Sequence, residues 1–309
     1  LKYNRPDKVL NLLGYSDSSL IEAYHKAYLK RLKKMDFSEN QLSSEFHLPE
    51  VKITNSVQLP AETKENSISL DLKITDSKFN LDRINIWVND VAIYGTNGIS
   101  LRNEKARSIE KSLTIDLANG RNKIQVSVLN GTGAESYKKA VEINSLQPNE
   151  SPNLYVVSLG VSEHKNSKYN LDFAHKDAID FASAFKANTY FKSVQSRTLT
   201  NEEVTLENLV DLKDFLGQAK INDVVMVFVA GHGVLDENFD YYFASYDMDF
   251  DNPSLRGIPY EAIENLLDGI KALKKLLLID TCHSGELDKD EIEENTNDKE
   301  TEQGDIIFR

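Results

Sequence analysis

Two apolar segments of this 309-residue chain end directly at chemically reactive side chains. The segment VVMVFVAG is followed by His232, and the segment LLLID leads, fifty residues after that histidine, to Cys282, the single cysteine of the chain. A continuous apolar run of this kind is typical of a strand that is buried on both faces of a parallel sheet. Because functional groups gather at the carboxyl ends of parallel strands, the thiol and the imidazole are predicted to meet at one edge of a sheet.

The pattern around these segments predicts the rest of the sheet. From residue 154 onward, short apolar runs alternate with helical periodicity, which is typical of βαβ units and of a mostly parallel sheet with helices on both faces. The helical stretch 172–187 has an apolar side made of Phe173, Ala174, Ala178, Phe181 and Phe185. We therefore expect an α/β domain over residues 152–285, with strands at 154–161, 193–200, 224–231, 241–247 and 274–280.

The first half of the chain has a different pattern. Residues 1–48 show a helical apolar stripe behind a capping box between Ser19 and Glu22, which predicts a single helix that acts as a connector. Residues 49–147 alternate apolar and polar residues between Gly and Asn turns, which predicts an antiparallel, immunoglobulin-like β-sandwich without a disulfide. Trp87 is predicted to be a core aromatic of this sandwich, and the two prolines of residues 145–153 predict a linker.

Composition excludes several classes of partner. The net charge of −13 argues against nucleic-acid binding, which requires clustered lysine and arginine. Much of that charge belongs to residues 286–305, a stretch with few apolar residues that is predicted to be a disordered linker. No apolar run approaches the roughly 18 residues of a membrane span. We therefore expect a cytoplasmic protein without membrane contact, and we interpret the start without methionine or signal peptide as an N-terminal truncation.

The residue types at the two strand ends indicate nucleophilic catalysis. A thiol is a poor nucleophile until it ionises, and an adjacent imidazole lowers its pKa and later protonates the leaving amine. The backbone amides of Gly233 and Cys282 could form an oxyanion hole beside this pair. His283 is the competing base, but neighbouring residues of an extended segment point to opposite sides, which favours His232. A buried structural cysteine is the alternative to this interpretation.

Three phrases carry a resemblance to a known family: FAHKDA, VFVAGHG and LLLIDTCHSG. With them, residues 154–285 resemble the large-subunit half of the caspase-like cysteine peptidases, and resemble metacaspases and bacterial caspase-like proteins more than animal caspases. The resemblance implies a caspase-like sheet, a catalytic dyad of His232 and Cys282, and oxyanion amides from Gly233 and Cys282. The NRPD phrase and the sandwich resemble segments found beside caspase-like domains in bacterial multidomain proteins.

The resemblance also implies a specificity. Animal caspases have QAC before the thiol and an arginine that binds aspartate, whereas this chain has Asp280-Thr-Cys282 and no arginine in residues 169–177. Metacaspases have an acidic S1 pocket, and its two aspartates match Asp177 and Asp280. Two carboxylates in one pocket repel each other until a cation pairs with both, so we expect cleavage after Arg or Lys. Ala230 stands where metacaspases often have serine, and the alternatives for the two aspartates are a solvated helix acid and a structural strand-end carboxylate.

Residues 286–309 form the predicted processing linker, because caspase-like zymogens are cut in this part of the chain. The sequence ends in GDIIFR309, and a peptidase that prefers arginine would produce such an end on itself. We therefore expect autocatalytic cleavage after Arg309 and a small-subunit fragment of the same precursor as a partner. An arbitrary chain boundary is the alternative.

No cofactor is required by this chemistry, and calcium is the candidate ion. Asp247, Asp249 and Asp251 form a D-x-D-x-D run of hard oxygen ligands, but the glycine and distal glutamate of an EF-hand are absent, so a solvated loop is the alternative. The sequence as a whole favours a cysteine endopeptidase that acts on proteins or peptides with a basic P1 residue. A non-catalytic, caspase-like regulatory module that binds partners is the second hypothesis, and another thiol hydrolase or transferase is the third.

Overall fold

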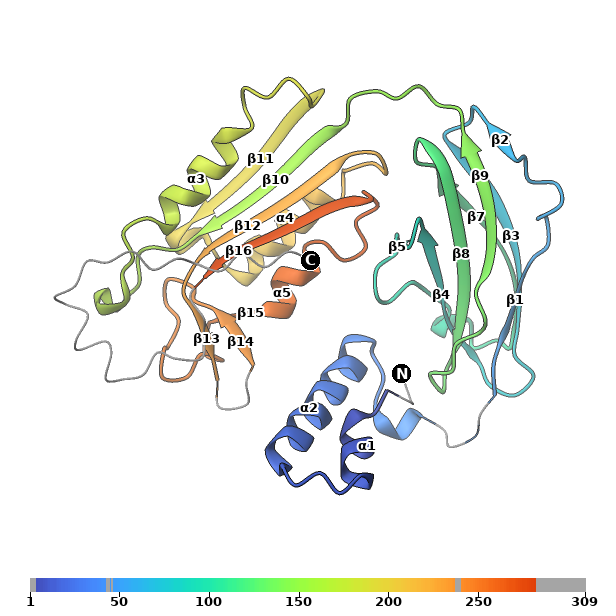
Figure 1. Ribbon diagram of the computed structural model, residues 1–309, viewed down its shortest axis with the longest axis horizontal. Helices are drawn as coiled ribbons and strands as arrows, with labels where there is room; N and C mark the ends of the chain where they lie inside the picture. Colours follow the sequence, from blue (N-terminus) through green and yellow to red (C-terminus); the bar gives the residue numbers. More distant parts are fainter. Residues whose placement is uncertain (1–3, 43–44, 46, 237–239, 282–309) are drawn as a thin grey trace. The chain divides into compact units, whose positions relative to one another are not determined.

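The computed structural model describes residues 4–42, 45, 47–236 and 240–281. By its internal contacts the chain divides into two compact units, Leu1–Asn149 and Glu150–Arg309 (Figure 1). The boundary between them falls within the proline-containing stretch 145–153. The finer four-part division of the chain stays a prediction, and each unit is described here by itself.

A four-stranded sheet forms the centre of the second unit. Its strands are β10 (Asn153–Gly160), β11 (Ser193–Thr200), β12 (Val224–Gly231) and β16 (Lys274–Thr281). They lie in the order β11-β10-β12-β16, and each neighbouring pair is parallel. The predicted parallel sheet is therefore confirmed. Apolar runs predicted β10, β12 and β16, whereas β11 is the polar stretch SVQSRTLT at the range expected for a strand.

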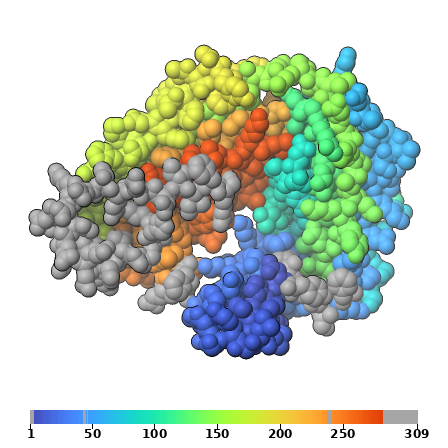
Figure 2. Space-filling view, viewed as in Figure 1, coloured from blue at the N-terminus to red at the C-terminus, as the bar shows by residue number. Residues whose placement is uncertain are grey.

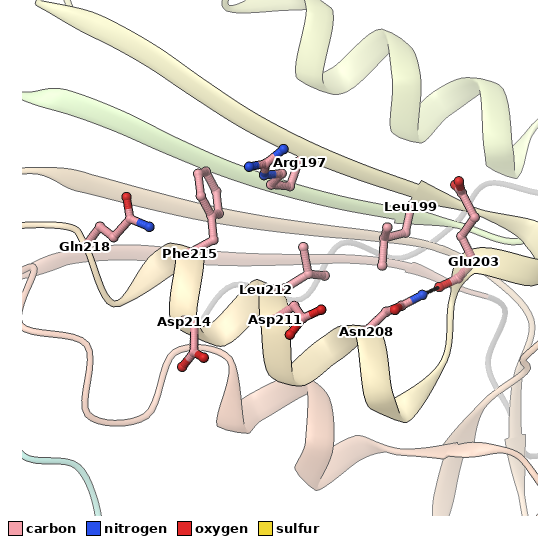
Figure 3. A pocket seen from close by; sticks show the side chains of 9 residues that line it. All are labelled: Arg197, Leu199, Glu203, Asn208, Asp211, Leu212, Asp214, Phe215 and Gln218. Atoms are coloured by element: carbon pink, nitrogen blue, oxygen red, sulfur yellow. Dashed lines mark hydrogen bonds between the residues drawn. The ribbon is translucent and has the colours of Figure 1, made fainter.

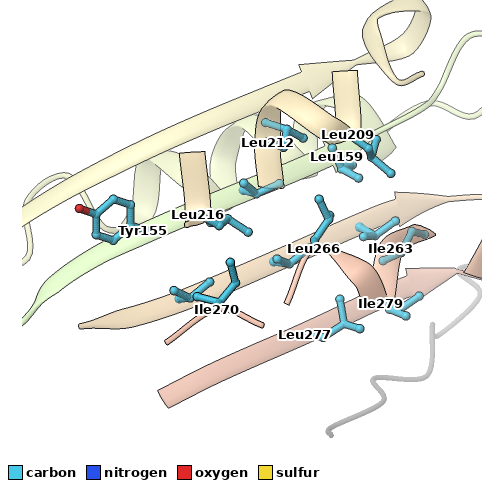
Figure 4. Packing of buried hydrophobic residues seen from close by; sticks show 14 of the residues in the cluster. Tyr155, Leu159, Leu209, Leu212, Leu216, Ile263, Leu266, Ile270, Leu277 and Ile279 are labelled. Atoms are coloured by element: carbon cyan, nitrogen blue, oxygen red, sulfur yellow. The ribbon is translucent and has the colours of Figure 1, made fainter. Parts of the chain in front are cut away.

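One face of this sheet is covered by helices α4 (Leu206–Leu216) and α5 (Tyr260–Asn265). Odd-numbered residues of the strands, such as Leu159, Leu277 and Ile279, pack with them in one buried cluster (Figure 4). Burying a side chain of this size contributes about 1.5–3 kcal/mol relative to leaving it in water, so this cluster is the main source of stability in the unit.

The opposite face is covered by helix α3 (Ala174–Ala184). Phe181 packs on this side with its ring centroid 4.6 Å from that of Phe228. A side chain on Gly160 would put its Cβ 2.4 Å from the carbonyl oxygen of Ala174, so only glycine lets the start of α3 approach the sheet this closely. The prediction for Phe173 was wrong: it precedes the first helical turn, and its side chain is exposed.

Three short strands form a separate antiparallel sheet: β13 (Gly233–Leu235), β14 (Tyr241–Phe243) and β15 (Ile258–Pro259). The strand predicted at 241–247 thus belongs to this small sheet and ends at Phe243, so within the described residues the large sheet is purely parallel. The small sheet begins one residue after His232, at the carboxyl end of β12.

The first unit contains two β-sheets. One joins β1 (Glu50–Ile53), β3 (Ser67–Thr75) and β7 (Ser108–Asp116). The other has the order β2-β9-β8-β4-β5, with β6 also paired to β4; the strands are β2 (Glu62–Thr63), β4 (Leu81–Val88), β5 (Val91–Ala92), β6 (Ile99–Ser100), β8 (Gly120–Asn130) and β9 (Lys139–Ser145). The strand pairs are antiparallel apart from β2 and β9, which are parallel and depart from the antiparallel expectation.

The predicted core position of Trp87 was wrong. Ile86 and Val88 take the buried side of β4, whereas Trp87 is half-buried on the other side, where the ammonium of Lys138 lies 3.6 Å from the ring centroid. Side chains alternate along a strand, so the two flanking aliphatic residues decide which way the indole points. The cation covers the ring face that the core does not.

The N-terminal segment forms two helices rather than one, α1 (Pro6–Leu12) and α2 (Ser18–Lys34). The cap of α2 is Asp17, whose carboxylate accepts hydrogen bonds from the amides of Ser19 and Leu20, so the expected box between Ser19 and Glu22 does not start the helix. Tyr28 and Leu32 are buried against Leu129 of the sandwich, which attaches the helical segment to β8. Short 3-10 turns lie at Glu39–Gln41, Arg102–Glu104, Ser167–Tyr169 and Asn201–Glu203.

Candidate active site

His232 lies directly after β12 and is half-buried. Its Nε2 atom is 2.9 Å from the main-chain carbonyl oxygen of Tyr169. A carbonyl only accepts hydrogen bonds, so Nε2 carries the proton, and the lone pair of the neutral ring belongs to Nδ1. The backbone of Tyr169 therefore fixes the tautomer that a general base needs and leaves Nδ1 as the acceptor.

Two further rings enclose this imidazole. The ring centroid of His164 lies 5.5 Å from that of His232, and that of Phe250 lies 5.8 Å away in an edge-on arrangement. Phe250 also stacks on Tyr169 at 3.7 Å. These three neighbours were not predicted. His164 follows the end of β10, so the rule that located His232 could have found it, whereas Phe250 comes from a loop and Tyr169 acts through its backbone.

His164 is a buried histidine with only 5% of its surface exposed. Its Nδ1 lies 3.2 Å from the carbonyl oxygen of Ser245, and its Nε2 has no hydrogen-bond partner among the described residues. Burial, and secondarily the charge of His232, lowers the pKa of His164 to about 4. His164 is therefore neutral near pH 7, when it adds no positive charge beside His232.

The strand register brings together the residues that precede the predicted dyad. Gly231 pairs with Thr281, and Ala230 pairs with both Gly160 and Asp280. Paired residues of a parallel sheet point to the same face, and the even-numbered residues of β12 face α3. Asp280 therefore belongs to the face of the sheet that α3 covers, beside the buried Ala230.

Asp177 lies in the first turn of α3 and is half-buried. Helix α3 crosses the sheet at Gly160, because the backbone of Ala174 and the side chain of Ala178 lie closest to that glycine. The two carboxylates predicted for S1 thus belong to the same side of the sheet. Cys282, His283 and Arg309 lie outside the described residues, and their roles stay predictions.

The three aspartates considered for calcium have structural contacts of their own. The carboxylate of Asp247 forms an ion pair with Arg256, with Oδ2 3.0 Å from Nε, and the carboxylate of Asp249 accepts hydrogen bonds from the backbone amides of Asp251 and Asn252. Across the described ranges no group of three or more His, Cys, Asp or Glu side chains is arranged to hold a metal ion. The contacts of Asp247 and Asp249 shape the loop that carries Phe250.

A shallow hollow of about 450 Å³ lies elsewhere, between the edge strand β11 and helix α4 (Figure 3). Most side chains of β11 are at least partly exposed, and the strand lies at the surface in the space-filling view (Figure 2). The hollow is lined by Arg197, Leu199, Glu203, Asn208, Asp211, Leu212, Asp214, Phe215 and Gln218. It contains no histidine or cysteine, so it offers no nucleophile and base pair.

None of the helices in the described part of the chain is both long enough and apolar enough to cross a membrane.

Comparisons with known proteins assign the second unit. No curated protein matches the chain. Among solved structures, the protein GSU0716 from Geobacter sulfurreducens is 19% identical, with a TM-score of 0.36, and the match covers 47% of this chain and 56% of that one. The fibronectin(III)-like modules of Clostridium thermocellum CbhA are 20% identical, with a TM-score of 0.25, covering 33% of this chain and 48% of theirs. This chain thus spans about half of each of those structures, and such scores do not bear on its fold.

The family model of the caspase domain, from the C14 peptidases, matches residues 155–307. The match contains the parallel sheet, α3, His232 and the strand that precedes Cys282. Residues 155–307 of this chain therefore match the caspase domain of the C14 peptidases.

Proposed function

We propose that this chain is a cysteine endopeptidase that cleaves proteins and peptides after Arg or Lys, with Cys282 as the nucleophile and His232 as the base. The observation that carries the proposal is the pairing of Gly231 with Thr281 at the ends of β12 and β16. Each proposed catalytic residue follows one member of this pair. Consecutive Cα atoms are about 3.8 Å apart, so both residues are tied by one peptide unit to the same edge of the sheet.

The tautomer of His232 determines which ring nitrogen takes up and returns the proton in each step. Its Nδ1 takes the thiol proton, and the thiolate attacks the carbonyl carbon of the P1 residue. The resulting imidazolium returns that proton to the departing amine, which leaves a thioester. Water then attacks the thioester, with Nδ1 again as the base, and the acid product and the thiol are released. The carbonyl of Tyr169 holds Nε2–H throughout, so the ring does not need to rotate between steps.

The oxyanion of each tetrahedral intermediate would be stabilised by the backbone amides of Gly233 and Cys282. A preorganised donor of this kind contributes about 3–4 kcal/mol to transition-state stability. Gly233 is the first residue of β13 and its backbone is buried, so a donor at this position would be held by the small sheet.

The basic P1 preference is supported by the shared face of Asp177, Ala230 and Asp280. A guanidinium or ammonium entering this face would meet carboxylates from α3 and from β16, while the small Ala230 leaves room between them. A substrate aspartate would instead meet like charge, which costs free energy in a partly buried site.

Three further parts of the proposal concern the rest of the chain. Autocatalytic cleavage of a zymogen after Arg309 would give a large fragment and a small-subunit partner. The first unit, as an immunoglobulin-like sandwich, would position protein partners. A bacterial, metacaspase-like role in the cytoplasm and a response to calcium complete the hypothesis, although the observed contacts of Asp247 and Asp249 are structural.

Fluorogenic peptides that differ only at P1 test the proposal. We expect hydrolysis with Arg and Lys at P1, little with Asp, and none by Cys282→Ala. Mass spectrometry of the longer precursor would show whether cleavage follows Arg309, and the same precursor with Cys282→Ala should stay intact. Equal turnover by wild type and Cys282→Ala would contradict the proposal.

A further inference from the structure

Tyr241 makes a hydrogen bond to the residue that precedes the proposed nucleophile. Tyr241 is the first residue of β14, and its hydroxyl oxygen lies 2.7 Å from the Oγ1 atom of Thr281. Thr281 is the last residue of β16 and is joined by a peptide bond to Cys282. The small antiparallel sheet is thereby linked through a side chain to the end of the large sheet.

The same phenol ring lies against Gly233. A Cβ atom at Gly233 would stand 2.1 Å from the hydroxyl oxygen of Tyr241 and 2.6 Å from its Cζ atom. Because no side chain fits in that space, the glycine is required for the ring to reach Thr281. One side chain therefore touches the proposed oxyanion donor and the residue bonded to the proposed nucleophile.

The ring itself is held from two sides. Tyr241 pairs with Leu235 across the β13–β14 hairpin, and the ring of Tyr260 lies edge-on to it with the centroids 5.9 Å apart. Tyr260 begins helix α5, which packs on the large sheet. The β13–β14 hairpin and the ring of Tyr260 therefore together fix the position of the Tyr241 hydroxyl.

We propose that Tyr241 is a positioning residue, which fixes the end of β16 and the amide of Gly233 relative to each other so that thiol, imidazole and oxyanion donors meet. The proposal rests on the proposed peptidase function. Tyr241 acts through Thr281 and Gly233 and is not assigned any contact with substrate.

Loss of the hydroxyl should affect chemistry more than substrate binding. Without the link, the strand end that leads to the thiol can move relative to His232, and the thiolate loses part of its pairing with the imidazolium. A hydrogen bond of this type is worth about one factor of ten in rate. We expect Tyr241→Phe to lower kcat about tenfold and to leave KM within about twofold, since the S1 carboxylates are untouched.

The single cysteine provides a second readout that needs no peptide hydrolysis. The rate of alkylation by iodoacetamide, measured against pH, gives the thiol pKa of Cys282 directly. Tyr241→Phe should raise that pKa by about half a unit to one unit. Thr281→Val should give the same change, Thr281→Ser should restore the wild-type value, and the double variant should be no worse than either single one.

Tyr242→Phe is the matched control. Tyr242 is the next residue of the same strand, so its side chain points to the opposite face, and it loses an identical hydroxyl. We expect wild-type kcat and thiol pKa for this variant, with melting temperatures of both variants close to wild type.

The proposal would be overturned if Tyr241→Phe had the same kcat and the same thiol pKa as the wild type. It would also be overturned if Tyr241→Phe and Tyr242→Phe lost kcat to the same extent. Failure of the wild type to cleave any peptide would overturn the proposed function instead. In that case the alkylation profiles still decide whether Tyr241 orders the thiol.

Discussion

The buried ionisable groups of the two units are satisfied in different ways. In the first unit the carboxylate of Asp82 lies between two arginines, with Arg83 Nε at 2.6 Å and Arg102 Nε at 2.5 Å. In the second unit the buried His164 stands beside another histidine, and one of its ring nitrogens has no partner among the described residues. Paired charges hold a structure together, whereas an uncompensated polar group beside a reactive one costs stability and is typical of a functional site.

The arginines of the first unit also connect its parts. Arg83 donates to the carbonyl of Met35, and Arg102 donates to the carbonyl of Asp36, both of which follow helix α2. The Asp82 cluster thus joins the helical segment to the sandwich. The comparison predicts that mutations in the first unit change stability, whereas mutations at the strand ends of the second change activity.

The largest expected effect is at the proposed dyad. His232→Ala removes the base, and we expect kcat/KM to fall by up to about 10⁴-fold, which is the contribution typical of general acid–base catalysis. The melting temperature should change little, because the half-buried ring is not part of the main apolar cluster. Peptide hydrolysis and thermal unfolding measured on the same sample test this. An unfolded His232→Ala protein would assign the residue to the fold and break the comparison.

The next effect is in the first unit. Asp82→Ala leaves Arg83, which is 2% exposed, without its carboxylate, and breaking a buried pair in this way costs about 3–5 kcal/mol. We expect the first unit of this variant to unfold at a clearly lower temperature, and we expect kcat per folded molecule to stay unchanged. Glu142→Gln, which breaks the exposed pair with Arg121, is the control and should leave the transition where it is.

The pattern of successes and failures has a physical cause. The strands β10, β12 and β16 and the position of His232 follow from the sequence because buried strands need continuous apolar runs and parallel strands end at a common edge. The exposed edge strand β11 carries no such run. The carbonyl of Tyr169 could not be predicted, since a main-chain group carries no residue signature. Phe250 and Tyr241 reach the site from loops and a hairpin, whose course depends on tertiary packing. The outward-facing Trp87 shows the same limit: strand alternation was visible, but the choice of face was not.

Lowering the pH should destabilise the two units over different pH ranges. Burial lowers the pKa of His164 to about 4 from an unfolded value near 6.5, so between these values the unfolded chain binds the extra proton. The stability of the second unit should therefore fall as the pH drops from about 6.5 to about 4, by up to about 3 kcal/mol. In the first unit the hydrogen bond from Arg5 holds the pKa of Asp7 far below its usual range, so that contribution is present above about pH 4 and is lost only at lower pH.

Urea unfolding at pH 7, 5.5 and 4, followed in each unit by hydrogen exchange, measures this separation. The variant His164→Phe keeps an aromatic ring and removes the titration, so the second unit of this variant should lose less stability over the interval. A fall of equal size in wild type and His164→Phe would show that other groups cause the acid response.

The smallest of these expected effects concerns the proposed S1 pocket. Asp280→Asn keeps the size of the side chain and removes one of the two charges on the α3 face of the sheet. We expect kcat/KM for a P1 arginine peptide to fall about tenfold to a hundredfold, and the preference for arginine over an uncharged P1 residue to fall with it, because one charge-assisted hydrogen bond is lost. Asp180→Asn on the exposed side of α3 loses an equal charge, paired with Lys176, and should leave both values unchanged. If the two variants behaved alike, net charge alone would explain the preference, and the acidic pocket would have to be sought elsewhere.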